Sequence, residues 1–377
     1  MKLGTKLLHT GYEVDPATGA ANIPIYQVSM FDQPGLDQPG EYDYARSGNP
    51  TRKAVEGVLA ALEGGAAAFA FSSGMAAVST VLMLLNAGDH VVVTDDCYGG
   101  TYRVLTRVFR RFGITATFVD TSDPAAVAAA VRPETRLLLV ESISNPFLRR
   151  TDIGAMAAIA RRQGCLLAVD NTFLSPYLSR PLAEGADLVI HSATKYLGGH
   201  SDLIAGAVAV KDPALAKEVY FLQNAVGAVL GPQDCFLLMR GIKTLKVRLD
   251  RQAATAAQLA DWLRSRPEVR EVFYPGIGAV LSFRLAAAAM AGPFVDQLEL
   301  PLVGVSLGAV ETILAVPARH SHASVPADER IRRGITDDLV RLSVGLEEPS
   351  DLMTDLDQAL AFAFAFAAGA GAGRMPR

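Results

Sequence analysis

The sequence has few cysteines and little net charge, and each shortage excludes a class of protein. Its three cysteines, Cys97, Cys165 and Cys235, lie far apart and form no C-x-x-C pair. We therefore expect neither a disulfide framework nor a metal site, and a reducing, cytoplasmic setting. The formal net charge of −4 gives no electrostatic reason to expect nucleic acid or an anionic membrane as a partner.

Long apolar runs are also scarce. The segment Met1–Thr10 carries lysines but no apolar stretch, so we do not expect a secretory signal. The apolar tail Ala359–Ala368 is too short to span a bilayer and passes into Gly-Ala repeats. We expect it to be the end of a packed helix followed by a frayed terminus, and we expect no membrane partner.

What remains is the composition of a folded protein with two domains. The chain has 377 residues, 50% of them hydrophobic, which exceeds one ordinary core. Short apolar runs alternate with segments of helical period such as Met75–Leu85, Arg103–Phe112 and Ile153–Arg162. This alternation predicts an α/β fold with a mostly parallel seven-stranded sheet, covered on both faces. The predicted strands are Ala68–Ser72, His90–Thr94, Thr115–Asp120, Arg136–Glu141, Cys165–Asp170, Asp187–His191 and Gly206–Val210.

The pattern changes on either side of this region. Residues 1–50 are rich in Gly, Pro and Asp, and we expect an extended arm without a core of its own. Residues 51–250 would form the large domain. Residues 251–377 mix a long Ala-rich helix with shorter strands, which predicts a smaller α+β domain. Its predicted strands are Ala279–Phe283, Pro301–Ser306, Thr312–Val316 and Arg341–Val344.

Polar side chains collect after the predicted strands, where open α/β sheets bind their ligands. The strings that follow five of the strands are Ser72-Ser73-Gly74-Met75, Asp96–Gly100, Ser144-Asn145-Pro146, Asp170-Asn171-Thr172 and His191–His200. The helix that begins at Gly74 and Met75 offers unpaired backbone N–H groups to a phosphate. The hydroxyls of Ser192 and Thr194 can donate to the same phosphate. The first and last strings therefore predict a phosphate site.

Three further residues fit pyridoxal 5'-phosphate as the ligand. Lys195 can form a Schiff base with the aldehyde of this cofactor. Asp170 can pair with the protonated pyridine nitrogen and keep the ring an electron sink. Tyr98 can stack on the ring, and its phenol can donate or accept a proton. Taken singly, each residue has an ordinary explanation: a solvated lysine, a turn-forming aspartate, a surface tyrosine. Their joint occurrence at successive strand ends favours the cofactor.

The sequence also resembles the trans-sulfuration family of pyridoxal-phosphate enzymes, which includes cystathionine lyases, cystathionine synthases, methionine γ-lyases and homoserine sulfhydrylases. The resemblance covers about Thr10 to Leu360. It implies a large domain of the aminotransferase-like fold type I. The strings that carry it are Tyr42–Arg52, Ser72–Ala77, Ser192–Asp202, Ser306–Glu311 and Arg341–Gly345.

The resemblance implies roles for individual residues, position by position. Tyr44 and Arg46 match a pair that reaches the cofactor phosphate of the neighbouring subunit. Arg341, with Ser306 nearby, matches the clamp on the substrate α-carboxylate. Family members are typically homotetramers built from two active-site dimers. The residues that match those holding or working the cofactor are Gly74, Met75, Tyr98, Asn145, Asp170, Ser192, Thr194 and Lys195.

The chain departs from the family pattern in two places. After Tyr274-Pro275-Gly276-Ile277 the family usually carries a longer loop and helix, whereas Gly278–Phe283 follow here almost at once. The string Arg319-His320-Ser321-His322 has an additional histidine to which the sequence assigns no role.

Two alternatives come from other classes of protein. Gly304–Gly308 fits the G-x-S-x-G pattern of hydrolases, with Glu311 and His320 following, but a nucleophile elbow must lead into a helix. Here Thr312–Val316 predicts another strand, which argues against a hydrolase. A non-enzymatic binding protein on this fold would be expected to lack Lys195.

The substrate is the least constrained part of the prediction. Family members that grip the distal ammonium of cystathionine often place Glu at the position of Val305. An apolar side chain suits an uncharged thioether, because it demands no buried charge pair. We therefore expect a carbon–sulfur lyase that acts by γ-elimination on methionine-like substrates (methionine, homocysteine or cystathionine), giving 2-oxobutanoate, ammonia and a thiol. Cystathionine β-lyase and γ-replacement on a homoserine ester stay open as alternatives.

Overall fold

The seven predicted strands form one sheet in a computed structural model that describes residues 1–11, 14–15, 17–323 and 325–372. The chain divides into two units. Unit 1 comprises Met1–Asp95, Val104–Ser142 and Thr151–Lys246. Unit 2 comprises Asp96–Arg103, Ile143–Arg150 and Val247–Arg377.

The large sheet belongs to unit 1 and has the order β1-β7-β6-β5-β4-β2-β3. β7 runs antiparallel to β1 and β6, and the other neighbours are parallel. The mostly parallel seven-stranded sheet predicted from the sequence is therefore confirmed. The strands are β1 (Ala67–Phe71), β2 (His90–Thr94), β3 (Thr115–Val119), β4 (Thr135–Glu141), β5 (Leu166–Asp170), β6 (Leu188–His191) and β7 (Gly206–Val210).

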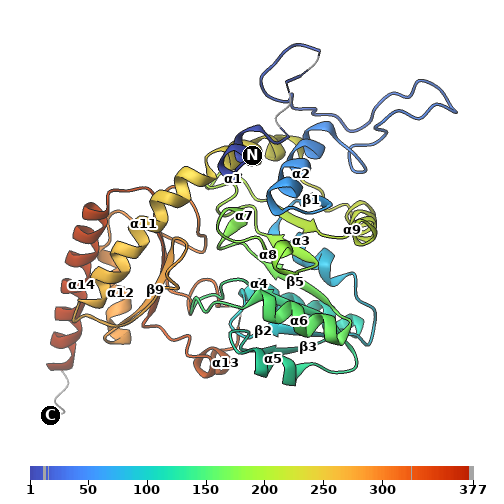
Figure 1. Cartoon of the computed structure of the whole chain (residues 1–377). Coiled ribbons are helices and arrows are strands. Elements are labelled where there is room, and N and C mark those ends of the chain that lie inside the picture. Colours follow the sequence, from blue (N-terminus) through green and yellow to red (C-terminus); the bar gives the residue numbers. More distant parts are fainter. Residues whose placement is uncertain (12–13, 16, 324, 373–377) are drawn as a thin grey trace. The chain divides into compact units, whose positions relative to one another are not determined.

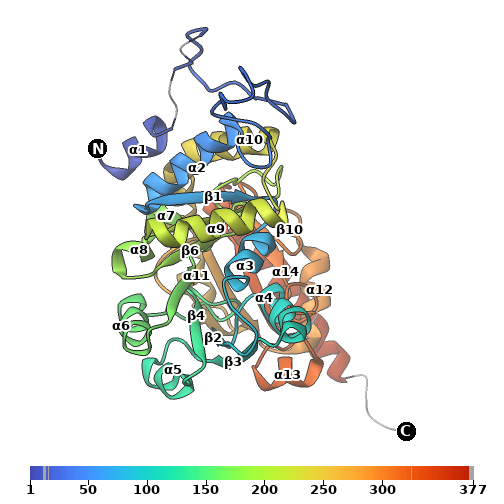
Figure 2. The same ribbon diagram turned by 90° about the vertical axis from the view of Figure 1, so that its right-hand side faces the viewer.

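Helices cover both faces of this sheet, which explains why its strands are continuous apolar runs. Every residue of β2, β6 and β7 is buried. Figure 2 shows α6 (Ile153–Gln163) and α8 (Pro181–Glu184) on one side, and α3 (Gly74–Leu82) and α9 (Pro213–Val226) on the other. The remaining helices of unit 1 are α1 (Leu3–His9), α2 (Pro50–Glu63), α5 (Pro124–Ala130), α7 (Ser175–Leu178) and α10 (Pro232–Lys243).

The predicted helix Arg103–Phe112 is irregular. α4 (Gly99–Arg103) ends where it was expected to begin, and a π-helical turn (η1, Val104–Val108) and a 3-10 turn (η2, Phe109–Phe112) follow. The run of apolar residues in this segment thus predicts a helix but does not fix its type.

The segment between α1 and α2 forms an arm. Its described residues contain no helix and only isolated bridges, one of which joins Met30 to Tyr44. Figure 1 shows this part of the chain looping away from α2 as extended backbone. Leu36 is fully exposed. The arm thus has little apolar packing within its own chain.

Unit 2 contains a five-stranded sheet of order β10-β11-β12-β9-β8. α11 (Leu245–Arg264), α12 (Ala291–Gln297) and α14 (Pro349–Ala372) pack on one face of it and enclose its apolar core (Figure 1). The predicted strand Pro301–Ser306 shortens to two residues: Pro301 has no N–H to donate to the ladder, and residues 304–306 lie outside the strand, with bends at 304 and 305. The strands are β8 (Val269–Phe273), β9 (Val280–Leu285), β10 (Leu302–Val303), β11 (Ile313–Ala315) and β12 (Leu339–Ser343), and α13 spans Ala327–Arg332.

The apolar C-terminal tail belongs to α14. Ala359, Leu360 and Ala363 are buried, so the predicted packed helix is present, while the predicted frayed end lies partly outside the described residues. Within the described parts of the chain, no helix combines the length and the apolar character that a bilayer crossing requires.

Candidate active site

Six of the predicted site residues lie at strand ends of unit 1, and we call them the strand-end cluster: Gly74, Met75, Asp170, Ser192, Thr194 and Lys195. Gly74 and Met75 open α3. The side chain of Ser73, the N-cap, accepts a hydrogen bond from Ala76 N at 3.0 Å. A capped helix start keeps its remaining amides oriented outward, as a phosphate site requires.

Gly74 is needed because two backbones approach closely at this point. A Cβ atom at Gly74 would lie 2.8 Å from Ser192 Cβ and 2.9 Å from Ser192 Oγ. No real Cβ tolerates such contacts. The glycine therefore brings the amides of the α3 terminus beside the Ser192 hydroxyl, so that both can serve one anion.

The ends of β5 and β6 are tied together through Thr172. Asp170 Oδ1 accepts hydrogen bonds from Thr172 N at 3.0 Å and from Thr172 Oγ1 at 2.5 Å. The same hydroxyl oxygen accepts a bond from Ser192 N at 2.8 Å. The orientation of the carboxylate is thus fixed relative to the strand end that carries Ser192.

Burial raises the pKa of Asp170, although the two bonds from Thr172 and the nearby His191 oppose the shift. A carboxylate in this environment gains stability from a cationic partner. Both hydrogen bonds that it receives from the described residues fall on Oδ1. Oδ2 can therefore accept from a protonated ring nitrogen.

Lys195 lies in the turn between β6 and β7. Its N–H donates to Ser192 O at 3.1 Å, and its carbonyl accepts from Gly199 N at 2.8 Å. Thr194 closes this turn, because its N–H donates to Ala205 O at 3.1 Å and its Oγ1 accepts from Ala205 N at 3.0 Å. The turn that carries the lysine is therefore hydrogen-bonded at both ends.

A second set of residues lies in unit 2, and we call it the Arg341 cluster: Tyr98, Asn145, Ser306, His322 and Arg341. Arg341, on β12, is fully buried. Its Nη1 donates to Asn145 Oδ1 at 3.0 Å and its Nη2 donates to Ser306 O at 2.9 Å. The structure thus brings Arg341 to both residues that the sequence placed beside the substrate or the cofactor.

The backbone around Tyr98 and Asn145 is held by neighbouring segments of unit 2. Asn145 N donates to Asp96 O at 3.1 Å, and Ser144 Oγ donates to Asp96 Oδ2 at 2.6 Å. A Cβ atom at Gly99 would lie 2.5 Å from Ser321 O, so only glycine fits there. The exposed Tyr98 therefore lies between Asp96 and Gly99, whose positions are fixed by these contacts.

His322, from the string Arg319–His322 that carries the additional histidine, also belongs to this cluster. It is fully buried, and its ring faces the backbone of Cys97 and Asn145. Burial, with a smaller contribution from Arg341, lowers the pKa of His322 to about 4. The ring is therefore neutral near pH 7 and adds no second positive charge beside Arg341.

Val305 and the G-x-S-x-G string lie on the irregular segment after β10. The side chain of Val305 is 63% exposed in this chain. No helix follows Ser306; bends lead directly to β11. The string therefore lacks the geometry of a nucleophile elbow.

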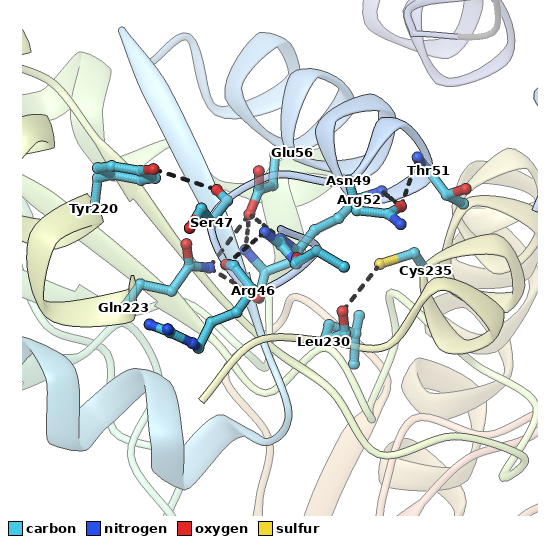
Figure 3. Close-up of polar contacts among 12 residues, drawn as sticks. Arg46, Ser47, Asn49, Thr51, Arg52, Glu56, Tyr220, Gln223, Leu230 and Cys235 are labelled. Carbon is cyan, nitrogen blue, oxygen red and sulfur yellow. Dashed lines mark hydrogen bonds and ion pairs between the residues drawn. The ribbon is translucent and has the colours of Figure 1, made fainter. Parts of the chain in front are cut away.

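Tyr44 and Arg46 lie on the arm of unit 1. The Arg46 guanidinium stacks on the Tyr44 ring at 5.4 Å from its centre, and Arg46 Nη1 donates to Asn224 O at 2.6 Å and Asn224 Oδ1 at 2.9 Å. Figure 3 shows Arg46 beside a network that includes Arg52, Glu56 and Gln223. Tyr44 is 47% exposed.

Comparison with known proteins decides the family, because the model of the Cys/Met metabolism PLP-dependent enzymes matches residues 4–361. The chain belongs to this family. It is 51% identical to the cystathionine beta-lyase MetC of Bacillus subtilis (strain 168), over 95% of this chain and 96% of that protein. It is 48% identical to the cystathionine gamma-lyase of the same organism, over 96% of this chain and 99% of that protein.

A solved structure of a related protein supports the same family and fold. The crystal structure of cystathionine gamma-lyase from Lactobacillus plantarum complexed with L-serine superposes with a TM-score of 0.94 at 44% identity, covering 96% of this chain and 99% of that one. The chain is therefore a fold type I, PLP-dependent carbon–sulfur lyase. The strand-end cluster fits the cofactor, since it combines a helix terminus cleared by Gly74 with a half-buried carboxylate that favours a cation.

Three residues with contacts of interest were not assigned from the sequence. Thr172 was recognised only as part of a string, although a hydroxyl two residues after an aspartate is a common turn signal. His322 was noted without a role. Arg52 carried no local signal, because its partners lie on the arm, and only the fold shows them.

Proposed function

We propose that this lyase cleaves cystathionine by β-elimination, releasing homocysteine, pyruvate and ammonia. The similarity to the B. subtilis cystathionine beta-lyase carries the choice of substrate. The buried Arg341 supports an α-amino acid substrate, since a planar guanidinium with fixed donors suits an α-carboxylate.

The strand-end cluster would hold the cofactor and move the proton. The amides at Gly74 and Met75 and the hydroxyl of Ser192 would bind the phosphate, and the hydroxyl of Thr194, which donates to Ala205 O at 3.2 Å in this structure, would turn to join them. When bound, the cofactor supplies an electron sink for the charge left at the substrate Cα. Lys195 would hold the cofactor through Nζ, and the same Nζ, in its neutral form, would remove the substrate Cα proton.

Asp170 and Tyr98 would complete the chemistry. Asp170 would keep the ring nitrogen protonated, and this is consistent with the buried environment that raises its own pKa. Tyr98 would stack on the cofactor ring and transfer protons on the side of the departing thiolate. Asn145 would serve the cofactor as well as orient Arg341, to which it is bonded.

A second candidate is γ-elimination of methionine, which the apolar Val305 favours. An apolar lining disfavours the distal ammonium of cystathionine if water is excluded. Val305 is 63% exposed, so an ammonium beside it would keep part of its hydration. For this reason we rank cystathionine first.

The arm would serve a neighbouring subunit. Tyr44 and Arg46 would donate to the cofactor phosphate of the partner copy in an active-site dimer, two of which would form the tetramer. Both residues are exposed on a segment without a core, and since Arg46 Nη1 is bonded to Asn224 of its own chain, the other guanidinium nitrogens of Arg46 would serve the partner. Mixing Lys195→Ala chains with Arg46→Ala chains tests this, because one site of each mixed dimer regains both native residues. Activity should reappear; if heterodimers form and activity stays absent, the arm serves its own subunit.

The 2-oxo acid released from cystathionine, methionine and homocysteine tests the reaction. Pyruvate with homocysteine from cystathionine is the expected result. Release of 2-oxobutanoate with cysteine from cystathionine would instead identify γ-elimination of that substrate, and 2-oxobutanoate with methanethiol from methionine would favour the second candidate.

A further inference from the structure

Arg52 is a buried arginine in the first turn of α2, and it donates to the arm. Only 3% of its surface is exposed. Its Nη1 donates to Ala45 O at 2.7 Å and its Nη2 donates to Arg46 O at 2.9 Å. The flat guanidinium thus binds two consecutive carbonyls, those of the two residues that follow Tyr44 in the sequence. Such a fork fixes the path of the backbone in a way that one donor could not.

Arg52 is itself held by a carboxylate that is anchored elsewhere. Its Nε lies 3.7 Å from Glu56 Oε1. The same oxygen accepts from Ala70 N on β1 at 2.9 Å and from Gln223 Nε2 on α9 at 3.3 Å. Burial raises the pKa of Glu56, while the bond from Ala70 and the charge of Arg52 oppose the shift. The guanidinium is therefore linked through Glu56 to β1 and α9.

Other contacts also hold the arm near Tyr44 and Arg46, among them the bonds from Arg46 Nη1 to Asn224 O and Oδ1 and from Ser47 Oγ to Asn224 Oδ1. Ala45 N donates to Ser29 O at 2.9 Å, and Tyr220 Oη donates to Ser47 O at 3.3 Å. Recognition of a phosphate requires donors held to within about 0.5 Å, and that demands a fixed backbone.

We propose that Arg52 is a positioning residue that holds Tyr44 and Arg46 in the orientation in which they bind the cofactor phosphate of the partner subunit. The inference rests on the proposed service of the arm across the dimer. It extends that proposal to a residue that touches neither cofactor nor substrate.

Arg52→Lys tests the role of the fork. Lysine keeps a positive charge beside Glu56 but cannot bind two carbonyls in a plane. We expect the dissociation constant of pyridoxal phosphate, measured by fluorescence titration of the apoenzyme, to rise about tenfold, as for the loss of one charge-assisted hydrogen bond. Arg264→Lys is the control, since Arg264 only pairs with Asp261 on an exposed helix face. Unchanged affinity in Arg52→Lys would overturn the proposal.

Mixing with Lys195→Ala chains shows where Arg52 acts. In a mixed dimer, the Lys195 of the Arg52→Lys chain meets an intact arm from its partner. Random assembly of equal amounts puts about a quarter of all sites in this class, and these should regain native cofactor affinity and activity. If the Arg46→Ala mixture recovers and the Arg52→Lys mixture does not, Arg52 serves its own subunit and the proposal fails, while the arm still acts across the dimer.

If neither mixture recovers although heterodimers form, the proposed service of the arm fails, and the role of Arg52 fails with it. If Arg52→Lys does not unfold cooperatively, the double variant Arg52→Gln/Glu56→Gln replaces it, because it removes both charges together. For the double variant, recovery on mixing with Lys195→Ala chains supports the proposal. Absence of recovery, while the Arg46→Ala mixture recovers, overturns it.

Discussion

The strand-end cluster and the Arg341 cluster are built by different means. In the strand-end cluster, backbone amides, hydroxyls and one carboxylate follow regular strands, and the contacts that fix them run between neighbouring strand ends. In the Arg341 cluster, a buried cation and a buried neutral imidazole hold irregular segments together, and Arg341 lies 196 residues from Asn145, which it contacts.

The difference predicts which property a substitution in each cluster should change. Strand ends are positioned by the whole sheet, so substitutions there should alter the chemistry and leave the fold intact. The Arg341 cluster is positioned by its own buried polar groups, so substitutions there should alter stability as well as substrate binding.

Lys195→Ala should have the largest effect, and it should not affect stability. Without the amine, the absorbance of the covalently linked cofactor and the turnover should disappear together, the latter by at least about a thousandfold. Spectra and steady-state rates measure both, and thermal unfolding should be native-like. Native turnover in this variant would remove Lys195 from the account.

Asp170→Asn should lower kcat by about a hundredfold, because the amide keeps the bond from Thr172 but loses the charge. Asp187→Asn is the matched control in the same unit, since Asp187 accepts from Leu167 N at the other end of the sheet. Equal losses in both variants would show a structural effect only.

Arg341→Lys should lower kcat/KM by about fiftyfold through KM, since a lysine cannot replace a two-point contact with a carboxylate. It should also lower the melting temperature, because Asn145 Oδ1 or Ser306 O loses its donor. Arg284→Lys on the adjacent strand β9 is the control for stability, because Arg284 donates to Gly334 O and pairs with Asp338. A change in kcat with constant KM would contradict the carboxylate role.

His322 should make stability depend on pH. Above pH 6.5 the ring is neutral in both the folded and the unfolded chain. As the pH falls below 6.5, the imidazole of His322 takes up a proton in the unfolded chain. In the folded chain its pKa is about 4, so it stays neutral until the pH is much lower. At pH 5 the native protein should therefore have lost about 2 kcal/mol of its unfolding free energy through this group.

His322→Gln should remove the part of the pH-dependent loss in unfolding free energy that comes from this ring. Arg341 and Arg333 are the charges that oppose protonation of the ring. Denaturant unfolding at pH 7 and pH 5 measures the difference, and the less buried His320→Gln should change it less. Identical pH dependence in the native protein and His322→Gln would mean that the ring is not held neutral.

Val305→Glu should have the smallest effect. A carboxylate at this exposed position should shift the ratio of kcat/KM toward cystathionine over methionine by up to about tenfold. Competition between the two substrates measures the ratio. A shift in the opposite direction would show that Val305 does not face the distal amino group.

The same contrast explains how much the sequence could predict. The predicted strands His90–Thr94 and Gly206–Val210 coincide with β2 and β7, because strands buried on both faces are uninterrupted apolar runs. The strand-end cluster could be found for the same reason, since its residues follow such runs directly.

The contacts of the Arg341 cluster could not be predicted in this way. His322 is significant only through partners distant in the sequence, and no local pattern reports these contacts. Outside this cluster, Arg52 binds carbonyls only six and seven residues earlier, but a backbone carbonyl gives no side-chain signal that would predict the contact. The helix type in Val104–Phe112 also escaped prediction, because apolar content does not distinguish π and 3-10 turns from an α-helix.

Exchange of the Cα proton tests the central claim most directly, because it depends on the roles proposed for Lys195 and Arg341 and needs no leaving group. Holoenzyme is incubated with L-alanine in deuterated water, and loss of the Cα–H signal is followed by proton NMR. Native protein should exchange this proton, Arg341→Lys should do so only at higher alanine concentration, and Lys195→Ala should not exchange it measurably. Native-rate exchange in Lys195→Ala would contradict the assignment of Lys195 as the base that removes the Cα proton.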